Sequence, residues 1–176
     1  EWMNGVYIRQ LPEDELAERI APILDRRLGT AVDRGQLRRV VPIIRERIKL
    51  LTEAVDMAGF FFLEGELEYG TGTLLGKKFV EDPGAAAGAL EAVLGRVSAL
   101  QPWEHEALEG AIRPLAGELG VKTGDLFGLI RVAVTGRTAA PPLFETVAVL
   151  GRERSLERLE SAIRRLGAEA SPRRSA

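Results

Sequence analysis

Apolar residues recur every three or four positions along most of the chain, the spacing that gathers them on one face of an α-helix. Leu37, Val40, Val41, Ile44 and Ile48 show it most clearly, with arginines on the other faces. No segment has the alternation of a half-buried strand. The pattern therefore predicts an all-α fold, with apolar helix faces at residues 16–24, 37–51, 87–100, 108–119, 126–134, 143–150 and 156–166.

Proline, glycine and acidic residues mark where these helices begin and end. Pro12 followed by three acids is typical of a helix start, and Asp82-Pro83 combines a cap with a first-turn proline. Gly29 is typical of a stop. Pro22 is expected to kink or divide the first long helix. Residues 64–82 hold four glycines and are expected to form a loop or ribbon.

These breaks predict two consecutive helical subdomains. The first spans residues 1–83, with 1–10 as a junction from a preceding part, and the second spans 84–167. Residues 168–176 are expected to be a disordered tail. The chain starts at glutamate rather than methionine, so we expect it to be a fragment of a longer protein.

Composition narrows the class of protein. Hydrophobic residues make up 45% and charged residues 28%, a balance typical of a globular domain. The apolar runs are far shorter than the ~20 residues that span a bilayer. With no cysteine and one histidine, we expect no metal site, no disulfide and no membrane contact. We expect a cytoplasmic monomer.

Charge is unevenly distributed despite the net value of −2. Residues 26–49 hold eight basic and two acidic side chains, and residues 121–176 hold ten basic and six acidic ones. A local basic surface is what phosphate binding requires, whatever the total charge. Charge alone does not separate this from an ordinary solvated helix face.

Two apparent active-site motifs lack the geometry that their chemistry requires. In the stretch from Gly70 to Lys78, Gly76 comes four rather than three positions after Gly72, which does not fit a dinucleotide fingerprint, and Thr71 stands where a Walker loop has its first glycine. Glu104, His105 and Glu106 are consecutive at a helix start and point in different directions. No nucleophile elbow or pair of catalytic carboxylates is apparent. We predict no catalytic residue, no cofactor site and no metal site in this chain.

Five segments, in order along the chain, resemble glutamyl-tRNA synthetases of the bacterial type. Residues 131–145, RVAVTGRTAAPPLFE, are similar to that family's R-V-A-L-T-G-R and S-P-P-L-F-E signature, and residues 150–153 to its L-G-K-E. Upstream, residues 4–9 (NGVYIR), 41–47 (VPIIRER) and 60–62 (FFF) also match. Residues 140 and 104 depart from the pattern: Ala140 replaces a usual hydroxyl residue, and Glu104 a usual capping one.

The resemblance implies an α-helix cage of two helical subdomains that binds the anticodon loop of tRNA-Glu. It also implies a parent enzyme that joins glutamate to tRNA using ATP and Mg²⁺. The ATP-binding signatures of that family are absent from this sequence, so the ATP and Mg²⁺ sites are expected outside it. Two alternatives stay open: a free-standing RNA-binding module that acts in trans, and a helical protein-interaction scaffold.

The resemblance also assigns site residues. Arg47 matches the arginine that reads the third anticodon base, which separates glutamate tRNAs from glutamine tRNAs. Pro141, Pro142, Leu143 and Phe144 match the loop that meets the anticodon. By pattern alone, Leu143 and Phe144 are core residues of a short amphipathic helix, an interpretation that the pattern favours for Phe144; the resemblance makes contact with the anticodon an equal alternative. The candidates for tRNA backbone contacts are Arg38, Arg39, Arg45, Lys49, Arg131, Arg137 and Thr138.

Overall fold

The computed structural model describes residues 2–170. In this part of the chain every regular element is a helix and no strand occurs, as predicted. The helices are α1 (Trp2–Gln10), α2 (Glu13–Leu28), α3 (Arg34–Ile44), α4 (Ala54–Ala58), α5 (Thr71–Phe79), α6 (Pro83–Val97), α7 (His105–Glu118), α8 (Thr123–Thr135), α9 (Leu143–Leu150) and α10 (Arg152–Ala170). Short 3-10 turns at Leu51–Glu53 and Gly59–Phe62 flank α4.

Local chemistry explains several helix ends. The carboxylates of Asp33 and Asp82 accept the backbone N–H three residues on, which caps α3 and α6. Pro83 occupies the first position of α6, where its missing N–H costs nothing. Gly29 and Gly136 end α2 and α8 with φ near +74° and +73°, a conformation that glycine adopts without strain.

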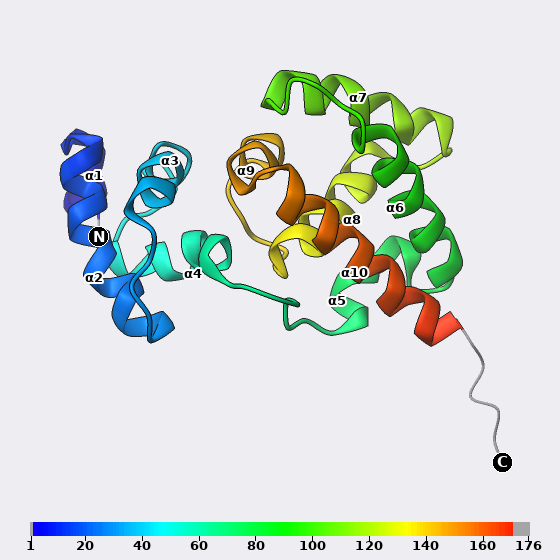
Figure 1. The fold of residues 1–176 in the computed structure, drawn as a ribbon, viewed down its shortest axis with the longest axis horizontal. Helices are drawn as coiled ribbons and strands as arrows, with labels where there is room; N and C mark the ends of the chain where they lie inside the picture. Colours follow the sequence, from blue (N-terminus) through cyan, green and yellow to red (C-terminus); the bar gives the residue numbers. More distant parts are fainter. Residues whose placement is uncertain (1, 171–176) are drawn as a thin grey trace, which may run out of the picture.

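The helices form two groups, visible from left to right in Figure 1. Helices α1 to α4 make one group, in which α2 packs on α3. In the other, α10 lies along α6, and α8 packs on α5 and α10. Helix α9 contacts both α3 and α7, so it joins the two groups. Because α5 packs on α6 and α8, the change of group comes before Thr71, ahead of the boundary predicted at residue 83.

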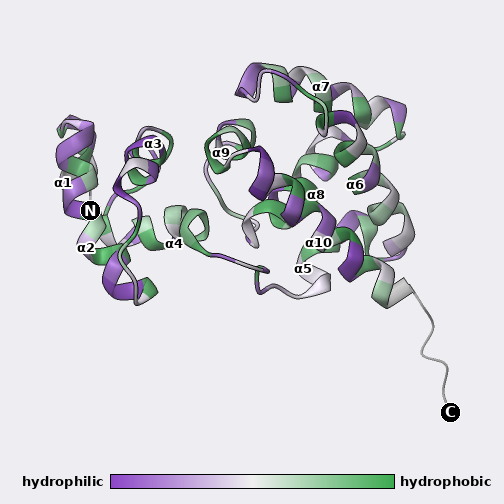
Figure 2. Ribbon diagram, viewed as in Figure 1, coloured by the Kyte–Doolittle hydropathy of each residue, from purple (hydrophilic) through white to green (hydrophobic). Residues whose placement is uncertain are grey.

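One apolar core runs through both groups. It includes Leu16, Ile20 and Val40 of the first group and Leu90 and Ile130 of the second. Figure 2 shows hydrophobic residues on helix sides that face neighbouring helices, with hydrophilic residues outside. Phe60 and Phe61, in the 3-10 turn after α4, are buried, and their rings pack on each other. No helix within residues 2–170 has the length and hydropathy to cross a bilayer.

Three local expectations differ from the structure. Pro22 lies inside α2 and does not divide it, because the helix continues to Leu28. The stretch 64–82 is not wholly irregular, because α5 forms within it. Residues 168–170 belong to α10, whereas residues 171–176 of the expected tail lie outside the described part.

Arginines of α10 donate hydrogen bonds to the segment that connects the two groups. Arg158 is 4% exposed, and its guanidinium donates to the carbonyls of Val134 at 2.7 Å and Phe60 at 2.8 Å. Burial, with a smaller effect of neighbouring positive charge, lowers the pKa of Arg158 to about 10. Further bonds run from Arg158 to Leu63, from Arg154 to Phe61, and from Arg165 to Leu67 and Tyr69. The segment that connects the two helix groups is therefore held against α10 by hydrogen bonds.

Candidate nucleic-acid interface

Two arginines that are far apart in sequence lie within range of each other's charge. Arg47 lies in the turn after α3 and is exposed, and Arg131 lies on α8 and is partly buried. Burial lowers the pKa of Arg131, and the positive charge of Arg47 lowers it further, so the two guanidinium groups interact electrostatically. Within residues 2–170, neither guanidinium has a hydrogen bond or an ion pair. Both residues were among the candidates that the family resemblance indicated for contact with tRNA.

Adjacent cations without acidic partners are unfavourable unless an anion or an acceptor-rich group approaches. A guanidinium presents five N–H donors in one plane, which suits phosphate oxygens and the acceptor edge of a base. Lys49, two residues after Arg47, is also exposed and its ammonium group has no partner in the described chain. Arg47 and Lys49 after α3, with Arg131 on α8, are therefore candidates for binding an anionic ligand.

The other arginines predicted on α3 are engaged. Arg38 is 3.0 Å from Asp14 and 3.6 Å from Glu18. Arg45 is 3.2 Å from Glu13 and donates to the backbone carbonyl of Arg9 at 2.6 Å. These contacts tie α3 to α1 and α2 and offset the positive charge there. Of the predicted basic residues around α3, Arg47 and Lys49 are those whose charged groups have neither a hydrogen bond nor an ion pair within residues 2–170.

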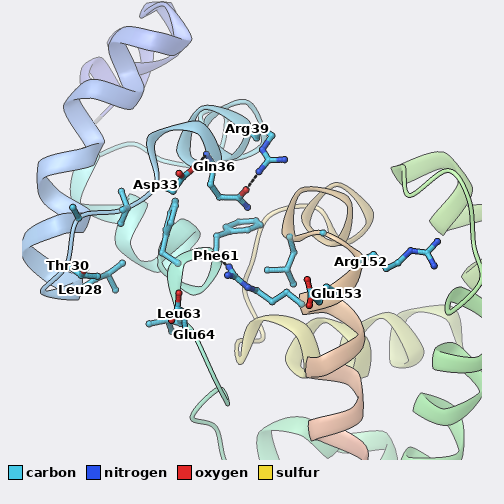
Figure 3. Close-up of a pocket in the computed structure, with 16 residues that line it drawn as sticks. Leu28, Thr30, Asp33, Gln36, Arg39, Phe61, Leu63, Glu64, Arg152 and Glu153 are labelled. Atoms are coloured by element: carbon cyan, nitrogen blue, oxygen red, sulfur yellow. Dashed lines mark hydrogen bonds between the residues drawn. The ribbon is translucent and has the colours of Figure 1, made fainter.

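Arg39 lines a different feature, a cleft of about 900 Å³ between α2–α3 and the α9–α10 junction (Figure 3). In that cleft, the side chain of Arg39 donates to Gln36, Arg152 donates to backbone carbonyls, and Arg154 donates to the carbonyl of Phe61. Acidic residues, among them Glu153, also line it. Because these cations already have partners, the cleft is a weaker candidate for an anion site than Arg47 with Arg131.

The loop after α8 carries Arg137 and Thr138, both exposed. The hydroxyl of Thr135 donates to the carbonyl of Arg131 at 2.7 Å and accepts the N–H of Arg137 at 3.1 Å, which holds the start of the loop against α8. Arg137 then reaches Asp56 on α4 at 3.0 Å. Sequence reasoning missed Asp56, and no motif or spacing marked it.

The side chains of the proline loop lie in the core, as one of the two interpretations of the sequence expected. Pro142 precedes α9 as its N-cap residue, but Leu143 and Phe144 are only 5% and 6% exposed. The ring of Phe144 packs edge-on to Phe127, with centroids 5.0 Å apart. Pro141 is buried as well. In this structure the side chains are core residues and offer no open face to stack on a base, while the N–H groups of the first turn of α9 have no side-chain cap.

No group of three or more potential metal-ligating His, Cys, Asp or Glu side chains occurs in the described residues. His105 begins α7, and its Nε2 lies 3.2 Å from a carboxylate oxygen of the neighbouring Glu106.

Comparison with known proteins identifies the class. A family model described as an anticodon binding domain matches residues 15–163. Glutamate--tRNA ligases of Roseiflexus sp. and Dehalococcoides mccartyi strain 195 are 48% and 42% identical over 91% and 94% of the chain. The chain spans about a third of their length, 32% and 34% respectively.

Solved structures agree on the fold. A glutamate tRNA ligase from Elizabethkingia meningosepticum superposes with a TM-score of 0.77 at 18% identity, covering 94% of this chain and 32% of that one. The glutamate-tRNA synthetase of Elizabethkingia anophelis gives 0.72 at 18% identity, over 93% of this chain and 30% of that one. The resemblance seen in the sequence is thus confirmed, and the chain belongs to the anticodon-binding domain family, as the anticodon-binding part found in glutamate--tRNA ligases.

Proposed function

We propose that this chain binds the anticodon loop of tRNA-Glu and presents that tRNA to the catalytic part of a glutamate--tRNA ligase. The observation that carries the proposal is that Arg47 and Arg131, whose guanidinium groups have no hydrogen bond or ion pair within residues 2–170, lie within range of each other's charge. One comes from each helix group, so an RNA loop bound between them is held by both.

In the proposed complex, Arg47 reads the third anticodon base. Anticodon bases are unstacked, and a protein can reach their edges directly. Cytosine presents adjacent acceptors that match the guanidinium donors, and a guanine in its place changes that pattern. Arg131, being partly buried, gains more from a phosphate or base acceptor than an exposed arginine would, because fewer water molecules compete. Lys49 supplies a further positive charge beside them.

The chemistry of aminoacylation is proposed to lie elsewhere. The chain covers about a third of its curated relatives. We assign glutamate activation with ATP and Mg²⁺ to the remainder of a longer protein, and tRNA positioning to this part.

A titration with anticodon stem-loops tests the proposal. The chain is titrated with one stem-loop carrying C at the third anticodon position and one carrying G, at several salt concentrations. We expect tighter binding of the C form, and an affinity that falls steeply with salt because each neutralised phosphate adds about 0.7–0.9 to the slope. Arg131→Gln should weaken binding, whereas Arg96→Ala, which removes an exposed arginine paired with Glu118 on α7, should not.

Failure of both stem-loops to bind at low salt would overturn the proposal and favour the scaffold alternative. Equal binding of the two would keep RNA binding and remove the assignment to tRNA-Glu.

A further inference from the structure

A small groove of about 150 Å³ lies between α5 and α8 and is separate from the Arg47–Arg131 pair. Lys77 and Lys78 line it from α5, and Gly124 and Gly128 from α8. Thr138, from the loop that follows α8, completes this part of the lining. The groove therefore reaches the loop already assigned to the proposed RNA surface.

Helix geometry makes the two sites neighbours. Gly128 lies three residues before Arg131, which places both on the same side of α8 about one turn apart. Thr138 directly follows Arg137. A strand of RNA whose bases meet Arg47 and Arg131 thus has its continuation within reach of α5.

The lysines of this groove are available. Both Lys77 and Lys78 are exposed, and neither ammonium group has a hydrogen bond or an ion pair within residues 2–170. Asp125 is the acidic residue among those lining the groove, and it lies in the first turn of α8, where a carboxylate interacts with that helix's own N-terminal N–H groups. The groove keeps an excess of positive charge.

The backbone at this groove is shaped by glycine. Gly76 has φ +56° and ψ −158°, which interrupts α5 immediately before the lysines and strains any other residue. Gly124 and Gly128 lie within α8, although glycine weakens a helix by roughly 0.5–1 kcal/mol relative to alanine. A Cβ at either position would meet nothing within 4 Å, so packing does not require glycine there. The glycines therefore contribute backbone to the lining of the groove, beside the apolar side chains of Leu74, Leu129 and Val132.

We infer that Lys77 and Lys78 bind the phosphodiester backbone of the RNA next to the anticodon, as an extension of the interface formed by Arg47 and Arg131. The inference rests on the proposed function and adds to it a second contact, of a different kind. A lysine ammonium is a compact charge with no fixed plane, which suits a phosphate more than a base edge. Contacts to phosphate hold the register of an RNA without reading its sequence.

The test is a double variant, Lys77→Ala/Lys78→Ala, titrated with the C-form and G-form stem-loops across a salt series. We expect binding about 3- to 10-fold weaker at low salt, by the same factor for both stem-loops, and a salt slope lower by about one to two. Arg19→Ala/Arg96→Ala is the matched control, because it removes the same number of exposed positive charges from α2 and α6.

The outcomes separate this inference from the proposed function. If the unaltered chain binds and the double variant binds as the control does, with an unchanged salt slope, the lysine contact is wrong and the anticodon interface stands. A loss confined to the C-form stem-loop would also overturn it, because that pattern is base reading. If the unaltered chain binds neither stem-loop, both proposals fall. Thermal unfolding checks that the variants are folded, and Lys77→Gln and Lys78→Gln serve as milder single variants.

Discussion

Arg137 and Asp56 are 81 residues apart in the chain and 3.0 Å apart in the fold, which ties the loop after α8 to α4. Both side chains are substantially exposed. An exposed ion pair of this kind contributes about 0.2–1 kcal/mol to stability, so its larger effect is on charge. Asp56 holds and partly neutralises an arginine that the family resemblance places at the RNA.

Neutralising that carboxylate should therefore strengthen RNA binding. We expect Asp56→Asn to bind an anticodon stem-loop about two- to fivefold more tightly at low salt, with the gain fading as salt screens the charges. Adding Asp56→Asn to an Arg137→Ala background should give a smaller gain. Equal gains in the two backgrounds would mean that Asp56 does not act through Arg137.

Arg47 should determine base preference without supporting the fold. Its side chain is exposed and has no hydrogen bond or ion pair in the described chain. A well-placed base contact contributes about 1–3 kcal/mol of discrimination, so Arg47→Gln should bring the ratio of the two stem-loop affinities close to one. Its thermal unfolding should match that of the unaltered chain. An unchanged affinity ratio would remove Arg47 from base reading.

Phe144 should affect stability rather than RNA binding. Its ring is buried against Phe127, so Phe144→Leu should lower the free energy of unfolding by about 1–2 kcal/mol. Affinity per folded molecule should stay within about twofold. Loss of a stacked base would instead cost about 1–3 kcal/mol of binding. A loss of that size in a folded variant would restore the stacking interpretation and imply that α9 rearranges when RNA binds.

Acid should weaken the link between α2 and α3. Asp25 accepts hydrogen bonds from Arg34 at 2.6 and 3.0 Å and from the N–H of Val32 at 2.7 Å. Arg34, followed by the Val32 N–H, lowers the pKa of Asp25 from 3.8 to about 2. A carboxylate with a lowered pKa stabilises the folded state above its unfolded-state pKa, and that contribution is lost as pH falls through the folded-state value.

Urea unfolding measured from pH 6 to pH 2 checks this. We expect Asp25→Asn to be less stable than the unaltered chain at pH 6 and the difference to shrink between pH 4 and pH 2. Glu91→Gln, which changes an exposed carboxylate with no ion pair in the described residues, is the control. A constant difference across that range would contradict the assignment.

The helices could be predicted from sequence because their signals are local. Apolar spacing, the Asp33 and Asp82 caps and the terminating Gly29 each act within a few residues. The helix α5 was missed because its glycines masked the periodicity on which the prediction depended. The exposed position of Arg47 was also predictable, since the apolar spacing from Leu37 to Ile48 leaves residue 47 off the buried face.

The arrangement of the candidate site was not predictable in the same way. The meeting of Arg47 with Arg131 depends on how α3, α8 and α9 pack, and no spacing rule reports contacts between residues that far apart. The same holds for the pairing of Arg137 with Asp56. The burial of Phe144 was one of the two interpretations of its pattern, but its contact with Phe127, 17 residues earlier, was not indicated by the sequence.

The bonds from α10 to the connecting segment also set an order of assembly. Arg158 binds the carbonyl of Phe60, a residue 98 positions earlier, and Arg165 binds that of Leu67 across the same separation. During synthesis the connecting segment leaves the ribosome long before its partners exist, so α1 to α4 are free to fold first and the two helix groups become aligned only when α10 emerges. A nascent chain that stops before Arg152 would contain both Arg47 and Arg131 but would lack the helix that holds the segment between them. Full RNA-binding capacity is therefore expected to arise in one late step of translation.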